Sequence, residues 1–450
     1  MLDVAAALLA VAVIQGACLL AAAALRRDVR LVLIAVTFLT PLLVSLWLPV
    51  DQGRVAYAAA AVVGLPALLI ADHRAGATVR ATLGPVARTP FAPFAVLYAV
   101  AASFGLLYGM ARGNDVVQVV GQTWTAALFL VGFCWFAPRL RELATPRFWV
   151  WFALAVAVLS LPGLADLAIS LAQNPDVFDR VLAKTDFYAF VCLLLAVGLV
   201  APRKPALGWA LAGFFAVVTL VTFTRSYWLG AAVGCMVLAV AAVHVRPKLP
   251  SGRTAALGAS VLAILVAAVA VSPIGGFAVD RVTQTHRGSG DTSVDLRGLE
   301  LNAAVRQVRE TPFAGIGSGG EFWSAHATSS SATAYGRVNF VHNAYVYFPL
   351  KFGVLGLAAV VALLVGLAQC GWAALRPGSA ATLADRTWVA VFGAVLAASV
   401  TAPNLVDPLY SLFCGALAGV AGLAVARPAP AGAPARVGTP ARVEGEPAWA

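Results

Sequence analysis

Charged residues are scarce in this 450-residue chain. Asp, Glu, Lys and Arg together make up 11% of the sequence, whereas hydrophobic residues make up 61%. A soluble globular domain carries about 25% charged residues, so this composition excludes that class and predicts a polytopic membrane protein. The apolar runs are about 20 residues long and do not alternate in polarity, which excludes a β-barrel. Because helices satisfy their own backbone in lipid, we expect an all-α bundle.

Cysteines are few as well, and none stands in a polar segment. The six lie in apolar runs, at Cys18, Cys134, Cys192, Cys235, Cys370 and Cys414. This distribution argues against a disulfide framework and against a metal cluster.

The apolar runs predict 12–13 transmembrane helices. They lie near residues 2–25, 31–50, 55–71, 91–110, 117–137, 148–163, 187–201, 206–224, 226–245, 255–275, 343–370, 387–403 and 408–426. Residues 1–275 then form the first ten spans, 276–342 a large and partly helical outer loop, and 343–426 the last three spans. The remainder, 427–450, is rich in Pro and Ala and is predicted to be a disordered tail.

The connecting loops differ sharply in charge. Alternate loops and the tail hold 19 of the 31 Lys and Arg residues, whereas the opposite short loops hold only five. The positive-inside rule places the basic set in the cytoplasm, so residues 276–342 are expected on the outer face. The net charge of +11 is then explained by these loops, and nucleic acid is not an expected partner.

Arg225 interrupts about forty apolar residues, within "VTFTRSYWLG". A charge deep in lipid costs several kcal/mol, so such an arginine is a functional candidate. The predicted topology places it in a hairpin at the outer face, where anchoring to lipid headgroups is the alternative role.

The predicted outer loop contains "VDLRGLELNAAVRQVRETPFAGIGSGG". Asp295 is a fair N-cap for a helix that has Arg297 in its first turn and stops before Pro312. The glycine turn that follows lacks the GK[ST] ending of a nucleotide P-loop, which argues against ATP binding. The stretch "SAHATSSSATAYG" is expected to be flexible, and His342 and Asn343 stand where the chain re-enters the membrane.

These segments together resemble the O-antigen ligase and O-antigen polymerase superfamily of bacterial membrane glycosyltransferases. The shared pattern is an arginine at the outer end of a helix, followed by a large outer loop with an arginine-containing helix, a Pro-x-x-Gly-x-Gly turn and a His-Asn pair. The matching residues are Arg225, Arg297, Pro312, Gly315, Gly317, His342 and Asn343. The resemblance covers residues 220–357, about a third of the chain.

The resemblance implies transfer of a glycan from undecaprenyl diphosphate to an acceptor hydroxyl by a GT-C-like enzyme, on the periplasmic face of the inner membrane. Arginine suits a diphosphate because its planar fork binds two oxygens and stays protonated. Histidine, with an ordinary pKa of about 6.5, suits a general base, although hydrogen bonding to the diphosphate is an alternative. The expected catalytic residues are His342, Arg225 and Arg297, and the expected substrate-binding residues are Arg225, Arg297, Arg306, Arg281, Asn343, Gly315 and Gly317. No metal or other cofactor is expected.

Two other functions fit the pattern. A polymerase would join carrier-linked repeats, whereas a ligase would use a finished lipid or similar acceptor; we favour the ligase, but the sequence does not separate the two. A transporter of lipid-linked glycans is disfavoured, because no acidic residue falls in the middle of a span and no half of the chain is repeated.

Overall fold

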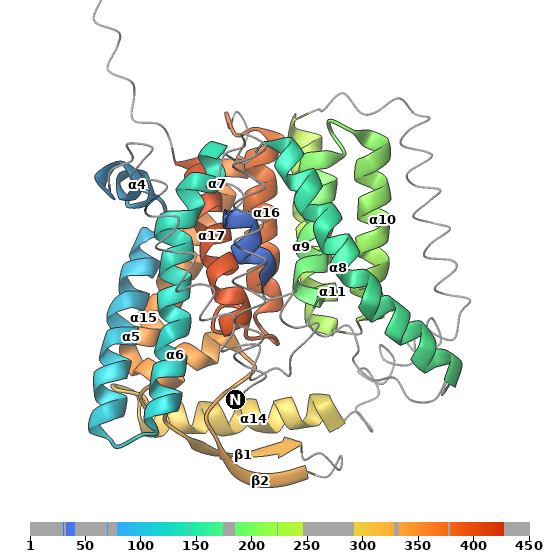
Figure 1. Cartoon of the computed structure of the whole chain (residues 1–450). Coiled ribbons are helices and arrows are strands. Elements are labelled where there is room, and N and C mark those ends of the chain that lie inside the picture. The colour runs from blue at the N-terminus through green and yellow to red at the C-terminus, as the bar shows by residue number, and fades with distance from the viewer. Residues whose placement is uncertain are drawn as a thin grey trace, which may run out of the picture.

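The computed structural model describes residues 33–40, 79–143, 145–173, 185–222, 224–245, 292–327, 333–376 and 379–426, and single residues 30 and 70. Within them the chain is an all-α membrane bundle with one small hairpin (Figure 1). Among the described residues, six helices are long and apolar enough to cross a membrane. The spans expected near 2–25 and 255–275, all of the span near 55–71 except residue 70, the tail and Arg281 lie outside the described residues.

The helices of the bundle follow the predicted spans, except that residues 79–86 and 137–143 are helical where loops were predicted. They are α4 (Val79–Val86), α5 (Ala92–Ala111), α6 (Val116–Val131), α7 (Ala137–Leu143), α8 (Pro146–Gln173), α9 (Asp186–Leu195), α10 (Pro205–Val221), α11 (Arg225–Val245), α15 (Ala344–Leu375), α16 (Leu383–Ala398) and α17 (Pro408–Val425). The π-helical segment η1 (Gly132–Phe136) joins α6 to α7, and η2 (Ala196–Val200) extends α9. The prediction was short at α8, which continues from its apolar part through Pro162 and Asp166.

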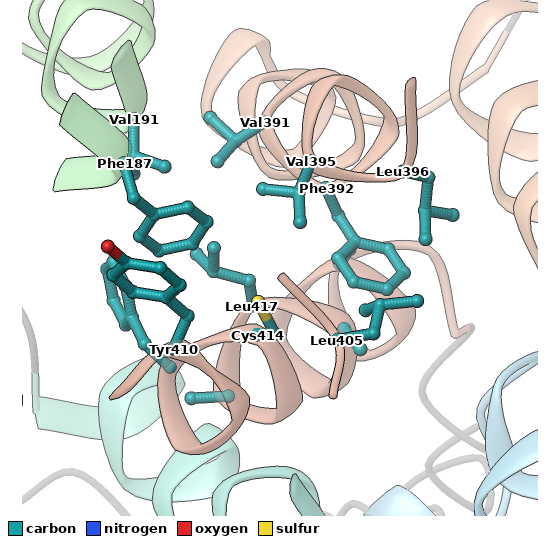
Figure 2. Packing of buried hydrophobic residues seen from close by; sticks show 14 of the residues in the cluster. Phe187, Val191, Val391, Phe392, Val395, Leu396, Leu405, Tyr410, Cys414 and Leu417 are labelled. Carbon is teal, nitrogen blue, oxygen red and sulfur yellow. The ribbon is translucent and has the colours of Figure 1, made fainter. Parts of the chain in front are cut away.

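Helices α9, α16 and α17 pack around a buried hydrophobic core (Figure 2). Phe187 of α9 stacks on Tyr410 of α17 with ring centroids 4.5 Å apart. Helix α17 also approaches η1 closely, because Gly132 and Gly415 face the backbone of the partner segment, where a Cβ atom would clash. Small residues at such contacts let membrane helices pack without a hydrophobic driving force.

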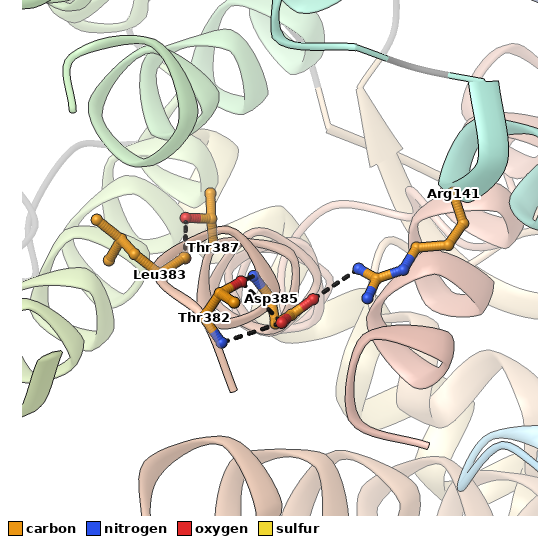
Figure 3. A network of polar contacts seen from close by, with 5 residues as sticks. All are labelled: Arg141, Thr382, Leu383, Asp385 and Thr387. Atoms are coloured by element: carbon orange, nitrogen blue, oxygen red, sulfur yellow. Dashed lines mark hydrogen bonds and ion pairs between the residues drawn. The ribbon is translucent and has the colours of Figure 1, made fainter. Parts of the chain in front are cut away.

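One end of the bundle carries a polar network at the start of α16 (Figure 3). Thr382 and Asp385 form a capping box, in which each side chain accepts a hydrogen bond from the backbone of the other. Arg141 of α7 donates to Asp385 across 2.6 Å. The contact brings together two of the loops that the charge pattern had placed on one side of the membrane.

The opposite end, called here the loop end, carries helix α14 (Thr292–Glu310) and a hairpin of β1 (Phe322–Ala327) and β2 (Thr333–Val338) (Figure 1). The strands are antiparallel, with Trp323 opposite Arg337. The prediction of a flexible stretch here was wrong for the two strands. Phe322 and Ser324 are buried while Trp323 between them is exposed, which is the alternation of a sheet with one covered face.

Candidate functional site at the loop end

The segments with the predicted site residues meet at the loop end. Arg225 is the first residue of α11, and two positions later the Tyr227 hydroxyl donates to Asn404 Oδ1 across 2.9 Å, in the connection between α16 and α17. That connection begins at Ser399, whose carbonyl accepts from the amide of Ala344, 3.0 Å away at the start of α15. Arg225 and the His342–Asn343 pair therefore flank the same α16–α17 connection.

His342 is joined to a carboxylate of α14. Its Nδ1 lies 2.8 Å from Glu300 Oε2 and 3.2 Å from Oε1, and its backbone amide donates to Oε1 across 3.2 Å. The side chain of Glu300 is 11% exposed and that of His342 is 48% exposed. The ring is thus held from the protein side by a buried acid while about half of it faces outward.

Arg297 lies one helical turn before Glu300 on α14, so the two share a helix face near His342. It is half-buried, whereas Arg306 is exposed. Arg306 follows Glu300 by six residues, which turns it roughly 120° away around the helix. The helix begins at Thr292, so Asp295 lies inside its first turn and is not the N-cap that the sequence suggested.

The glycine turn fills a break in helix α15. Gly353 has φ 57°, which interrupts the helix four residues after Pro349. The carbonyl of Leu350 accepts from the amide of Ile316 at 2.8 Å, and the carbonyl of Lys351 accepts from the amide of Gly317 at 3.0 Å. A broken helix in a membrane needs such substitute partners for its backbone.

This packing assigns the two glycines a structural role. Gly315 and Gly317 are buried with φ 67° and 77°, and their amides donate to the carbonyls of Thr311 and Lys351. The two amides therefore have partners within the protein, and a substrate contact of these glycines stays a prediction. Asn343 is similarly engaged, because its Oδ1 caps α15 by accepting from the amide of Val346 at 3.1 Å.

One segment of the chain, which includes the loop end, matches a known family. Residues 210–361 match the model of the O-antigen ligase family (Wzy_C), a range that holds the site residues described above. This segment belongs to the O-antigen ligase family. Members are membrane glycosyltransferase-like enzymes whose substrates are lipid-linked glycans. A comparison with curated proteins gave no significant match.

Residues outside the O-antigen ligase segment hold its glycine turn in place. Asn114, after α5, donates to the carbonyls of Ile316 and Ser318 at 3.2 and 2.8 Å. Gln122 of α6 accepts from the amide of Gly319 at 2.8 Å and donates to the carbonyl of Asn339 at 3.1 Å. One glutamine thus ties the glycine turn to the strand end that leads into His342.

Sequence reasoning missed two further buried charged residues near the candidate site. Lys351 is fully buried beside the break in α15, where its Nζ donates to the carbonyl of Gly320 at 2.6 Å. A lysine inside an apolar span is itself a functional signal, and it was overlooked. Asp186 is buried at the start of α9 and accepts from Thr224, the residue before Arg225, at 3.0 Å. Its place at a span end gave no such signal.

Proposed function

We propose that this chain is an O-antigen ligase-type enzyme of the bacterial inner membrane, with its loop end facing the periplasm. It moves a glycan from undecaprenyl diphosphate to an acceptor hydroxyl, such as one on a lipid A–core molecule. The observation that carries this proposal is the His342–Glu300 pair, a half-exposed imidazole held by a buried carboxylate. The pair stands at the end of the bundle where Arg225 and Arg297 also lie.

The proposed reaction is a displacement at the anomeric carbon of the donor. The acceptor oxygen bonds to that carbon, and its proton passes to Nε2 of His342. The bond between the anomeric carbon and the diphosphate oxygen breaks, and the diphosphate leaves with the electron pair. General base assistance of this kind contributes typically about 100- to 10,000-fold in rate.

The arginines act on the leaving group. Negative charge builds on the diphosphate as it departs, and preorganised cationic donors stabilise that charge. We assign this task to Arg225 and Arg297, because a guanidinium offers two parallel N–H donors to phosphate oxygens. Arg306 is exposed and turned away from the Glu300 face, so any contribution from it is expected to be smaller.

The choice of acceptor is tested with purified protein and carrier-linked repeats. Incubation with the donor alone leaves a ligase's substrate unchanged until a lipid acceptor is added. A ladder of lengthened carrier-linked products without added acceptor would instead identify a polymerase. The His342→Ala variant measures the background rate of product formation. Net movement of intact donor across the membrane of sealed vesicles, in place of transfer, would identify a transporter.

A further inference from the structure

Glu300 presents both carboxylate oxygens to one residue. Oε2 is 2.8 Å from the His342 ring nitrogen Nδ1, and Oε1 is 3.2 Å both from Nδ1 and from the backbone nitrogen of His342. An ionised carboxylate only accepts hydrogen bonds, and the backbone N–H only donates. For both contacts to be hydrogen bonds, Nδ1 must carry a proton.

We infer that Glu300 is a positioning residue that holds His342 in the Nδ1–H tautomer, with the lone pair of Nε2 directed to the acceptor hydroxyl. This inference rests on the proposed function, in which His342 is the base. A neutral imidazole has one N–H and one lone pair, so fixing the proton on Nδ1 is what makes Nε2 basic. Without that constraint the ring also populates the Nε2–H form, which cannot take a proton from the acceptor.

Burial gives the carboxylate a second effect. When Nε2 takes the acceptor proton the ring becomes an imidazolium, and its positive charge forms beside the side chain of Glu300, which is only 11% exposed. Opposite charges attract more strongly where water is excluded, so the carboxylate favours the protonated ring that forms during transfer. The proton stays on His342 until solvent removes it. Acid–base–nucleophile triads use a carboxylate in the same way.

Aromatic packing holds the ring from another direction. Phe340 meets the His342 ring edge to face, with centroids 5.7 Å apart, and Phe340 itself lies 5.7 Å from the ring of Tyr347 in α15. The orientation of His342 is thereby set by the Glu300 carboxylate of α14 and by the ring of Phe340, which itself packs against Tyr347 of α15. Glu300 comes from a different part of the loop, 42 residues earlier, so its contact also ties α14 to the start of α15.

A purely structural role of Glu300 and a positioning role predict different effects of its substitution. If Glu300 only fastens α14, its loss lowers stability or donor affinity whether or not His342 is present. If it acts through His342, its loss matters for the chemical step only while the imidazole is there. The two roles separate in a double-mutant cycle.

The cycle compares Glu300→Gln, His342→Ala and the double variant by single-turnover transfer at saturating donor. We expect Glu300→Gln to lower the rate about 100-fold or more, because a glutamine amide can donate to Nδ1 and favour the wrong tautomer. In the His342→Ala background the same change is expected to cost nothing further. Glu310→Gln, an exposed acid at the end of the same helix, serves as the matched control and keeps the parent rate.

The tautomer is measured directly in the parent protein. Nitrogen-15 NMR of histidine-labelled protein, with the His342 signals assigned by their absence in His342→Ala, is expected to show a protonated Nδ1 and a bare Nε2 at neutral to alkaline pH. This measurement decides the inference even if Glu300→Gln does not fold.

Three results would overturn the inference, and a fourth concerns the function. A folded Glu300→Gln with the parent rate, an additional loss in the His342→Ala background, or an Nε2–H tautomer in the parent would each exclude the positioning role. If His342→Ala itself keeps the parent rate, the proposed base is wrong, and Glu300 has no base to position.

Discussion

The carbonyl oxygen of Lys351 accepts a hydrogen bond from the amide of Gly317, 3.0 Å away, across the break in helix α15. The glycine turn of the loop is therefore part of the membrane bundle and not a separate lid above it. Because α15 begins two residues after His342, any displacement of the turn is expected to reach the site.

Gly317→Ala is expected to destabilise the protein. Its φ of 77° is a left-handed conformation that costs an L-residue roughly 1–2 kcal/mol. An added Cβ would also lie 2.9 Å from Gly109 Cα of α5, where neither backbone can move away easily. Thermal unfolding in detergent should show a lower midpoint together with lost transfer. Gly371→Ala is the control, since nothing lies within 4 Å of that position; equal melting of the two variants would contradict the argument.

Gln122→Leu is expected to uncouple the glycine turn from the segment before His342. The change removes the acceptor for Gly319 and the donor to Asn339, each worth about 0.5–1.5 kcal/mol net. Single-turnover transfer should fall because the loop shifts relative to α6. Gln118→Leu, an exposed position one turn earlier on α6, should behave as the parent. Full transfer by Gln122→Leu would show that the turn is held without this residue.

Part of this architecture could be predicted from sequence and part could not. Hydropathy and loop charge depend on local composition, so they located α5, α11 and α15 to within a few residues. The pairing of Glu300 with His342 joins residues 42 positions apart, and no periodicity within α14 marks Glu300 as different from Glu310. The break in α15 was readable in principle, because Pro349, Lys351 and Gly353 all disturb an apolar helix.

The hairpin was missed for a related reason. Its strands are short and contain small residues such as Ser324 and Gly336, so composition favours a loop. Tertiary contacts stabilise the hairpin, because Phe322 is buried and β1 lies alongside α14. A strand that depends on a neighbouring helix has little signal of its own, because sheet propensity largely measures packing.

If Arg225 and Arg297 bind the diphosphate, a positive charge alone at these positions is not expected to support full transfer. Arg225→Lys and Arg297→Lys keep the positive charge but lose the bidentate fork. Each is expected to lower single-turnover transfer by about 100- to 1000-fold, as for removal of one transition-state donor. Arg112→Lys is a matched control, because Arg112 is an exposed arginine beside the Tyr108 ring at the same end. Parent rates for both site variants would mean that the fork is not required.

The orientation of the bundle is tested by labelling. In a background without native cysteines, Tyr335→Cys places a thiol on the hairpin at a side chain that is 70% exposed. Lys204→Cys places one at the exposed connection between η2 and α10, at the opposite end of the bundle. An impermeant thiol reagent on spheroplasts should label the first and not the second. The reverse pattern would place the loop end in the cytoplasm and remove the basis for a periplasmic reaction.

The assignment of His342 as a base, and not as a ligand of the diphosphate, is tested by separating binding from chemistry. His342→Ala should retain most of its donor affinity, because Arg225 and Arg297 remain, while single-turnover transfer falls by about 100- to 10,000-fold. His342→Gln serves as a second variant, since an amide can still hydrogen-bond a phosphate oxygen but cannot act as a base at neutral pH.

The pH dependence has a definite sign. A protonated imidazole has no lone pair, so parent transfer should decline as the pH is lowered, and the decline should be absent from the residual activity of His342→Ala. If His342→Ala instead loses donor binding and reaches the parent rate once donor is saturating, the imidazole holds the diphosphate, and the proton must leave the acceptor by another route.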